Sequence, residues 1–325
     1  MNAWRTYLEK GFVHRTDRVL GDWFLFSSFS RISMKDFVTE SPENPTHRTV
    51  TLTAYTGQEK LIHDIKNLFE ARNHPALQYA LLHGSIASDE VIPYSDFDGI
   101  LIVKASAIKS AFLLRSLRKL IELSEEMIVR FDPLQHHGWQ IVFAEELSAL
   151  HASVVPSILL DESKLIYRSA DSSYTLDYYE QSSDQRKVLK HLLDSIRRKC
   201  RQPNKIRDRY ALKNLLSEIL LSPAVFLQSQ SPERIGKKDS FTLIRAYADA
   251  IELDILDRAS HVRRQWKSER INPKIALFHR LKRKGCYLSD LAPSITAPEE
   301  LDMLSEQGLS SIRKYCDQLE KIALT

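Results

Sequence analysis

The stretch LLHGSIASDEVIPYSDFDGILIV (81–103) determines how we interpret the first half of this chain. It completes a short apolar run, Leu77–His83, which predicts a buried strand ending at Gly84. The segment SIASDEV (85–91) predicts one or two turns of helix, and Pro93 and Tyr94 predict a turn. A second apolar run, 97–105, predicts another buried strand. Strand, short helix, turn and strand therefore follow one another within a few residues.

Two carboxylates, Asp96 and Asp98, stand two residues apart where the second of these strands begins. Side chains alternate between the faces of a strand, so both carboxylates are expected to point the same way. Mg²⁺ takes oxygen ligands in octahedral geometry and is usually bound by one or two carboxylates together with substrate phosphates. Two such ions roughly 3.5–4 Å apart activate an attacking hydroxyl and stabilise the leaving oxygen. The pair therefore predicts a Mg²⁺ site.

Gly84 and Ser85 stand where the first strand ends and the short helix begins. A strand-to-helix turn presents backbone N–H groups and a hydroxyl to an anion, and glycine allows a phosphate to approach closely. Neither this turn nor the Asp-x-Asp pair is specific alone. Their order and local structure together predict a phosphate and metal site.

The residues around this stretch predict a sheet with helices packed on it. Apolar spacing predicts helices over 58–72 and 107–126. We expect a strand at Met127–Phe131, ended by Pro133, and another at Trp139–Ala144. The polar segment 37–48 predicts a loop, and the aromatic residues of the preceding segment are expected to pack against the core.

Strand signals vanish after about residue 181, and helical periodicity replaces them. Helices are expected over 185–198, 208–227, 240–266, 273–284 and 298–324. The small polar segment at 168–184 predicts the boundary. We expect an N-terminal extension packed on the core (1–50), an α/β (α+β) domain with a mixed sheet (51–175) and an all-helical bundle (176–325).

The pattern Gly84-Ser85, nine residues, then Ser95-Asp96-Phe97-Asp98-Gly99 and an apolar run resembles the nucleotidyltransferase superfamily, typified by DNA polymerase beta and the aminoglycoside nucleotidyltransferases. The resemblance implies a palm domain and transfer of a nucleoside monophosphate from an NTP such as ATP to a hydroxyl, with release of pyrophosphate. It implies that Gly84, Ser85 and Ser95 bind the triphosphate and that Asp96 and Asp98 bind one or two Mg²⁺. The sharp motif covers about residues 80–104.

One departure from the family concerns its third carboxylate, which lies on a neighbouring strand. Matching apolar patterns places Gln140 there, and an amide is neither a general base nor a good Mg²⁺ ligand. Asp132 and Glu145 are alternative acids. His137, in the pair His136-His137, could accept the proton of the acceptor or bind a metal. The residue that completes the site stays open among these four.

The helical domain adds three candidate triphosphate ligands. Lys213 shares a helix face with Tyr210, although it could simply extend its ammonium group to solvent. Lys238 precedes a helix that we expect Asp239 or Ser240 to cap, and a helix N-terminus with lysines attracts anions. Lys238 and Ser240 also resemble a lysine–serine segment by which helical domains of several nucleotidyltransferases reach the triphosphate.

Two runs of cations, 186–213 and 263–284, predict a basic face on the helical domain. Such a face is either solvated or a positive wall that faces an anionic substrate such as a triphosphate or RNA, and RNA or a protein is the candidate partner on it. The net charge of +4 does not by itself indicate a nucleic-acid binder.

Composition limits the class of protein. With 43% hydrophobic and 27% charged residues, disorder and fibrous repeats are excluded as the main state. Three scattered cysteines lack the spacing of a disulfide framework or a zinc site and predict reduced thiols. The charged N-terminus and the lack of a long apolar run predict a cytoplasmic protein without a membrane segment. No nucleophile elbow, Walker A loop or dinucleotide fingerprint is present.

The sequence therefore predicts a Mg²⁺-dependent nucleotidyltransferase whose helical domain selects the acceptor. A small hydroxyl compound is the first choice of acceptor, since no extra nucleic-acid module is evident, and an RNA end or a protein side chain is the second. The alternative is a non-catalytic nucleotide- or RNA-binding protein, or a regulatory protein such as a toxin–antitoxin component, on the same fold.

Overall fold

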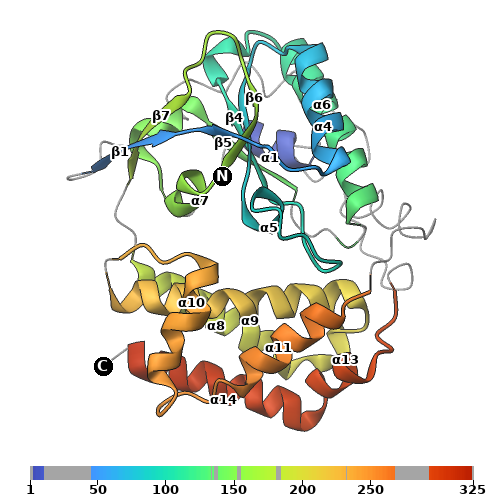
Figure 1. Ribbon diagram of the computed structural model, residues 1–325, viewed down its shortest axis with the longest axis vertical. Coiled ribbons are helices and arrows are strands. Elements are labelled where there is room, and N and C mark those ends of the chain that lie inside the picture. The colour runs from blue at the N-terminus through green and yellow to red at the C-terminus, as the bar shows by residue number, and fades with distance from the viewer. Residues whose placement is uncertain are drawn as a thin grey trace. The chain divides into compact units, whose positions relative to one another are not determined.

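The computed structural model describes residues 3–10, 45–132, 134, 138–151, 155–180, 184–231, 233–267 and 293–323. These residues divide into two compact units (Figure 1). The sheet unit contains the described residues up to Val91 and those from Ser95 to Glu180. The helical unit contains Ile92–Tyr94 and the described residues from Asp184 onward. The expected aromatic cluster before residue 37, and the expected helix over 273–284, lie outside the described residues.

The sheet unit is built on a mixed five-stranded sheet with the strand order β2-β6-β3-β4-β5. Its strands are β2 (Thr53–Ala54), β3 (Leu77–Leu82), β4 (Gly99–Val103), β5 (Trp139–Phe143) and β6 (Lys164–Arg168). The β3 strand pairs antiparallel with both β4 and β6, whereas β2–β6 and β4–β5 are parallel. The expectation of mixed α/β architecture with a mixed sheet is confirmed.

One face of this sheet is covered by α1 (Ala3–Lys10), α4 (Lys60–Arg72) and α6 (Ala111–Phe131), and Figure 1 shows α4 and α6 side by side along it. Residues 3–10 of the predicted N-terminal extension therefore pack on the core. On the edge strand, Arg5 Nε of α1 donates a hydrogen bond to Ile141 O at 3.0 Å. A side chain of α1 thus satisfies an edge carbonyl that no sixth strand reaches in the described sheet.

The other face packs against the 3₁₀ helix η3 (Ala144–Ala149), α7 (Ser157–Asp161) and β7 (Thr175–Glu180). The β7 strand pairs antiparallel with β1 (Thr46–Thr51) in a separate two-stranded sheet. This pairing keeps residues up to 180 in the sheet unit. Two further short helices, α5 (Gly84–Ala87) and the 3₁₀ helix η2 (Ala105–Ala107), flank β4 in sequence.

The strand predicted at Met127–Phe131 is wrong, because α6 continues through Phe131. Its buried positions recur at helical spacing to the end, through Leu117, Ile121, Ser124, Ile128 and Phe131. Apolar residues such as Ile128 and Val129 suit either structure in isolation, and the amphipathic period of the longer helix prevails.

The helical unit contains α8 (Gln185–Arg201), α9 (Arg209–Gln230), α10 (Lys237–Leu243), α11 (Asp254–Gln265), α13 (Pro298–Met303) and α14 (Glu306–Ala323), with short 3₁₀ helices at Pro203–Lys205 (η4) and Ile244–Tyr247 (η5). The single helices expected over 240–266 and 298–324 are each divided, the first by the turn at 248–253 and the second at Leu304 and Ser305. A helical C-terminal region is confirmed.

The core helix of this unit, α9, carries Pro223 in its interior. Proline has no N–H, so the carbonyl of Ile219 loses its usual helical donor. The Ser222 hydroxyl donates to that carbonyl at 2.7 Å, and it also lies 2.9 Å from Tyr315 Oη of α14. The Ser222 hydroxyl thus replaces the missing backbone donor of α9 and links this helix to α14.

By length and composition, α9 could also cross a membrane, yet 67% of its most apolar window is buried inside the protein. Buried core helices meet the same criterion, so this feature does not indicate a membrane segment.

Candidate functional site

The Gly-Ser turn predicted from the sequence lies directly after β3. Gly84 is the first residue of α5 and has a φ of +68°, a conformation that side chains with a Cβ rarely adopt. The Gly84 carbonyl accepts from Ser88 N at 3.3 Å, and the Ser85 carbonyl accepts from Glu90 N at 2.9 Å. Gly84 is exposed and Ser85 is half-buried, so this turn faces solvent.

The Asp-x-Asp segment immediately precedes β4 rather than forming part of the strand. Phe97 is completely buried and packs edge-on against Trp139, with ring centroids 4.8 Å apart. Asp96 and Asp98, on either side of it, are both half-buried. This alternation turns Phe97 to the helix-covered face and fits two carboxylates that share the opposite side of the chain.

The two halves of the motif meet in space. His83 N donates to Asp98 O at 3.0 Å. A Cβ atom built on Gly84 would lie 2.7 Å from Oδ2 of Asp98. Asp98 and the Gly-Ser turn therefore lie in direct contact.

Gln140 lies on the neighbouring strand β5, level with the start of β4. In the parallel β4–β5 pair, Gln140 lies opposite Ile100. Ile100 and Val142 belong to the core on the sheet face opposite the helices. Asp98 stands two residues before Ile100, and Gln140 two residues before Val142, so both side chains are on that same face. Gln140 therefore presents an amide on the same face of the sheet as Asp98.

The alternative acids differ from what we expected. Asp132 is the C-cap of α6 rather than the end of a strand, and its Oδ1 accepts from Leu134 N at 3.0 Å. The Glu145 carboxylate accepts from Ala105 N and Ser106 N at 3.0 and 2.9 Å. These two hydrogen bonds satisfy the first backbone N–H groups of η2. His136 and His137 lie outside the described residues.

Ser95 is buried, with 4% of its surface exposed. In the described residues no group of three or more His, Cys, Asp or Glu side chains is placed to hold a metal ion. Asp96 and Asp98 nevertheless provide two carboxylates, the hard oxygen donors by which proteins bind Mg²⁺ when phosphate oxygens complete its coordination. The amide of Gln140 is a weaker donor, so the fit to Mg²⁺ rests on the two carboxylates.

In the helical unit, Lys213 is completely buried, which excludes the expectation that it extends its ammonium group to solvent. Its Nζ lies 5.1 Å from the ring centroid of Tyr94. Tyr94 Oη donates to Lys213 O at 3.0 Å and lies 3.1 Å from Ser217 Oγ, while the Tyr94 ring packs edge-on against Trp266 at 5.1 Å. A buried ammonium group beside aromatic rings is the setting in which cation–π attraction is strongest.

Behind this cluster, Arg209 stacks its guanidinium over the Trp266 ring at 4.0 Å. Arg209 Nε also donates to Glu300 Oε1 at 3.0 Å, and Nη1 donates to Lys267 O at 3.0 Å. No local sequence pattern predicts this arrangement, because its residues are distant along the chain. Tyr94 lies in the turn predicted beside Pro93.

The lysine–serine segment differs in detail from the expectation. The helix α10 begins at Lys237 with Gly236 as its N-cap, and no side chain caps it, so neither Asp239 nor Ser240 has the predicted capping role. Ser240 is buried and its hydroxyl donates to Lys237 O at 2.7 Å. Lys238 is exposed. The segment places two exposed lysines, Lys237 and Lys238, in the first turn of a short helix.

The predicted basic face divides into buried and exposed cations. Arg197 pairs with Asp317 at 2.8 Å, and Lys199 pairs with Glu218 at 2.8 Å. Arg209 and Lys213 are buried. The cations of α8 and the following loop that remain exposed are Arg186, Lys187, Lys190, Arg198, Arg201, Lys205 and Arg207. The second basic run lies largely outside the described residues.

Comparison with known proteins adds no relative. No family model, no curated protein and no solved structure matches this chain.

Proposed function

We propose that this protein is a Mg²⁺-dependent nucleotidyltransferase that moves a nucleoside monophosphate from an NTP to a hydroxyl acceptor. The observation that carries the proposal is the contact between the Gly-Ser turn and Asp98. A phosphate bound at the backbone of Gly84 and Ser85 would lie beside the Asp96–Asp98 pair. Few other chemistries need an anion-binding turn and two carboxylates at the same place.

In the proposed reaction the acceptor oxygen forms a bond to the α-phosphorus, and the bond from that phosphorus to the bridging oxygen of pyrophosphate breaks. Asp96 and Asp98 would hold Mg²⁺, which when bound would supply positive charge against the triphosphate. Gly84 and Ser85 are the proposed triphosphate ligands, whereas Ser95, Lys213 and Ser240 are buried and offer the triphosphate no accessible group. Gln140 cannot take the proton of the acceptor, so His137 is the proposed base. A small hydroxyl compound remains the first proposed acceptor, and an RNA end or a protein side chain the second.

Gln140 favours a second candidate function, a nucleotide- or RNA-binding protein without turnover. The position carries an amide where the family has a carboxylate, and an amide binds Mg²⁺ weakly and accepts no proton. Such a protein would bind Mg²⁺–NTP without releasing pyrophosphate.

Calorimetric titration with each of the four NTPs in the presence of Mg²⁺ tests the proposal. Wild type is expected to bind one NTP preferentially, and the variant Asp96→Ala/Asp98→Ala is expected to lose that binding. The variant Glu70→Ala/Asp171→Ala removes two exposed acids from the same unit and serves as the matched control. Equal affinity in wild type and the Asp96→Ala/Asp98→Ala variant would contradict the assigned site.

Turnover then separates the two candidate functions. Wild type is incubated with the preferred NTP and candidate acceptors, and pyrophosphate release is followed. Release that depends on Asp96 and Asp98 supports the enzyme. Binding without release across small hydroxyl compounds, RNA and protein acceptors supports the non-catalytic candidate.

A further inference from the structure

Along the chain, Asp96 lies between two buried aromatic residues, one in each compact unit. Tyr94, two residues before it, is 4% exposed and belongs to the helical unit. Phe97, the next residue, is completely buried in the sheet unit, where it packs on Trp139. Two residues of chain span at most about 7 Å, so the position of Asp96 depends directly on where Tyr94 is held.

Tyr94 is held by both its hydroxyl and its ring. The hydroxyl donates to Lys213 O at 3.0 Å and lies 3.1 Å from Ser217 Oγ, and both of these residues are on α9. The ring packs edge-on against Trp266, the C-cap of α11, with centroids 5.1 Å apart. The Lys213 ammonium and the Arg263 guanidinium lie 5.1 and 5.9 Å from the ring centroid. Hydrogen bonds and cation–π attraction thus anchor Tyr94 in the helical unit.

The main chain that follows this anchor lacks regular structure. Residues 95–98 belong to no helix or strand, and β4 begins only at Gly99. A helical or sheet ladder therefore does not fix the backbone of Asp96, and the aromatic residues on either side of it do. A carboxylate that is already fixed binds a cation more tightly, because less conformational entropy is lost on binding.

From these contacts we infer that Tyr94 is a positioning residue for Asp96, through which the core of the helical unit tunes metal and nucleotide binding at the Asp96–Asp98 pair. The inference rests on the proposed function, which assigns that pair to the metal. It gives the buried Lys213 the task of supporting the anchor instead of contacting the triphosphate. Coupling between sites is reciprocal, so a nucleotide bound beside Asp96 also alters the surroundings of Trp266.

The variant Tyr94→Phe tests the anchor, because it keeps the ring and removes the hydroxyl. Electron paramagnetic resonance follows binding of Mn²⁺, in place of Mg²⁺, to the full-length protein with each of the four NTPs. Tyr94→Phe is expected to weaken binding of the preferred NTP by about three- to tenfold, the range that loss of such hydrogen bonds allows. Tyr79→Phe is the matched control: it removes an equally buried hydroxyl, which donates to Ser173 O at 3.0 Å, and should leave affinity unchanged.

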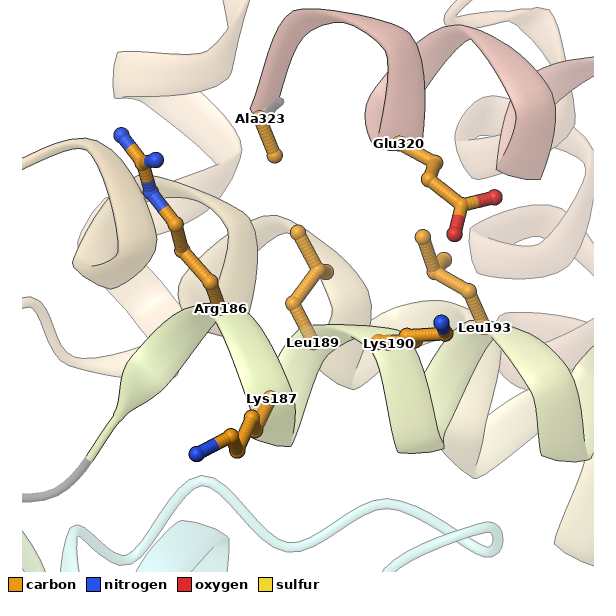
Figure 2. Close-up of a pocket in the computed structure, with 7 residues that line it drawn as sticks. All are labelled: Arg186, Lys187, Leu189, Lys190, Leu193, Glu320 and Ala323. Atoms are coloured by element: carbon orange, nitrogen blue, oxygen red, sulfur yellow. The ribbon is translucent and has the colours of Figure 1, made fainter. Parts of the chain in front are cut away.

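A second control addresses general loss of stability in the helical unit. Figure 2 shows Leu189 and Leu193 pointing from α8 toward α14, where Ala323 lies beside them. Leu189 is 2% exposed, so Leu189→Val removes a methylene group from a packed contact. This variant is expected to lower the free energy of unfolding and to retain nucleotide affinity, because the anchor contacts of Tyr94 come from α9 and α11.

The ring of Trp266 supplies a readout that a merely structural role of Tyr94 would not change. In protein labelled with 5-fluorotryptophan, the ¹⁹F signal of Trp266 is the one that Trp266→Phe lacks. Addition of Mg²⁺ with the preferred NTP is expected to shift this signal in wild type but not in Asp96→Ala/Asp98→Ala. In Tyr94→Phe the shift should be smaller even at saturation, because the link through the hydroxyl is gone.

The outcomes distinguish the inference from the proposed function. Failure of wild type to bind any NTP with Mn²⁺ would overturn both. Binding by wild type that Tyr94→Phe retains at full affinity would overturn the inference alone. The same holds for an equal loss of affinity in Tyr79→Phe or Leu189→Val, and for a full shift of the Trp266 signal in saturated Tyr94→Phe.

Discussion

The carboxylate of Asp98 lies against the main chain of Gly84, so close that a Cβ atom on Gly84 would sit 2.7 Å from Asp98 Oδ2. Real Cβ contacts are essentially never shorter than 3.0 Å, and φ at Gly84 is already +68°. The positive φ favours glycine at this position, and a side chain there would in addition displace the Asp98 carboxylate.

We therefore predict that Gly84→Ala displaces Asp98 and weakens Mg²⁺–NTP binding. The left-handed conformation should add about 1–2 kcal/mol of destabilisation. Calorimetry measures the first effect and chemical denaturation the second. Gly138→Ala is the control, since its Cβ would meet Glu125 Oε1 at an ordinary 3.5 Å. Unchanged binding by Gly84→Ala would mean that the turn and the carboxylate do not act together.

A second prediction concerns the amide on β5. Gln140→Glu adds a carboxylate on the face that Asp98 shares, so Mg²⁺ affinity is expected to rise by about tenfold. Competition with Mn²⁺, followed by electron paramagnetic resonance, measures the change. Asp132→Asn should leave Mg²⁺ affinity unaltered, because an amide oxygen can still accept from Leu134 N and Asp132 caps a helix. A loss of affinity in Asp132→Asn alone would move the third ligand to that residue.

A third prediction concerns the buried imidazole of His74. Its Nδ1 accepts from Ala76 N at 3.2 Å, which leaves Nε2 to carry the proton beside Ser116 Oγ at 2.8 Å. Burial lowers the pKa of His74 below its ordinary value of 6.5. The unfolded chain therefore binds the proton first as the pH falls, and the folded protein loses stability below about pH 6.5, by up to about 1.4 kcal/mol per pH unit.

Urea denaturation across this pH range, on wild type and His74→Gln, checks the assignment. His74→Gln is expected to be less stable at neutral pH and to show a shallower loss toward acid. His63→Gln, at an exposed position, should retain the wild-type slope. If the slope of His74→Gln equals that of wild type, another group titrates.

A fourth prediction concerns the buried ion pair of Arg209 and Glu300, whose side chains are 7% and 5% exposed. Glu300→Leu leaves a buried guanidinium without its carboxylate and is expected to cost about 3–5 kcal/mol. The double variant Arg209→Met/Glu300→Leu should recover much of that loss, because it leaves no unpaired charge. Urea denaturation of the single and double variants measures their free energies of unfolding. An equal loss of stability in both variants would indicate that the ion pair itself, rather than the isolated charge, accounts for the effect.

The fifth prediction concerns thiol reactivity. Burial raises the pKa of Cys200 to about 11 and that of Cys316 to about 12. At pH 8 the thiolate fraction of either residue is then on the order of one in a thousand or less. In Cys286→Ser, which removes the cysteine outside the described residues, native protein should react with a thiol reagent only at the rate of unfolding. Rapid labelling of native Cys286→Ser would show that one of these thiols is accessible.

The parts of the fold that sequence could predict are those where local pattern and tertiary environment agree. The β4 strand is buried on both faces, and its unbroken run of apolar residues indicated this directly. The end of α6 was misassigned because apolar residues such as Ile128 and Val129 suit a strand in a short window. The β1 and β7 strands were not predicted, because β1 is largely exposed and polar and each strand pairs with a partner far along the chain, although β7 buries Leu176 and Tyr178.

The site divides in the same way. Gly84 follows β3 and Asp98 precedes β4, and these two strands pair antiparallel. The short sequence spacing between the two residues therefore predicts that they lie close together. The environment of Lys213 depends on Tyr94 and Trp266, which come from distant segments, and no periodicity connects them. An apolar helix face predicts burial of its neighbours, whereas the burial of a lysine depends on partners that only the folded chain provides.

The pairing of β1 with β7 also constrains how the chain matures. The β3 and β4 strands are near neighbours in sequence and can pair early, but Thr46–Thr51 must wait for Thr175–Glu180, and β2 for β6. Such distant contacts form slowly. During synthesis from the N-terminus, the first strands leave the ribosome with their hydrogen-bonding edges uncovered until nearly the whole sheet unit has followed. In this interval a nascent chain is most exposed to mispairing, and a chaperone would have the most to protect.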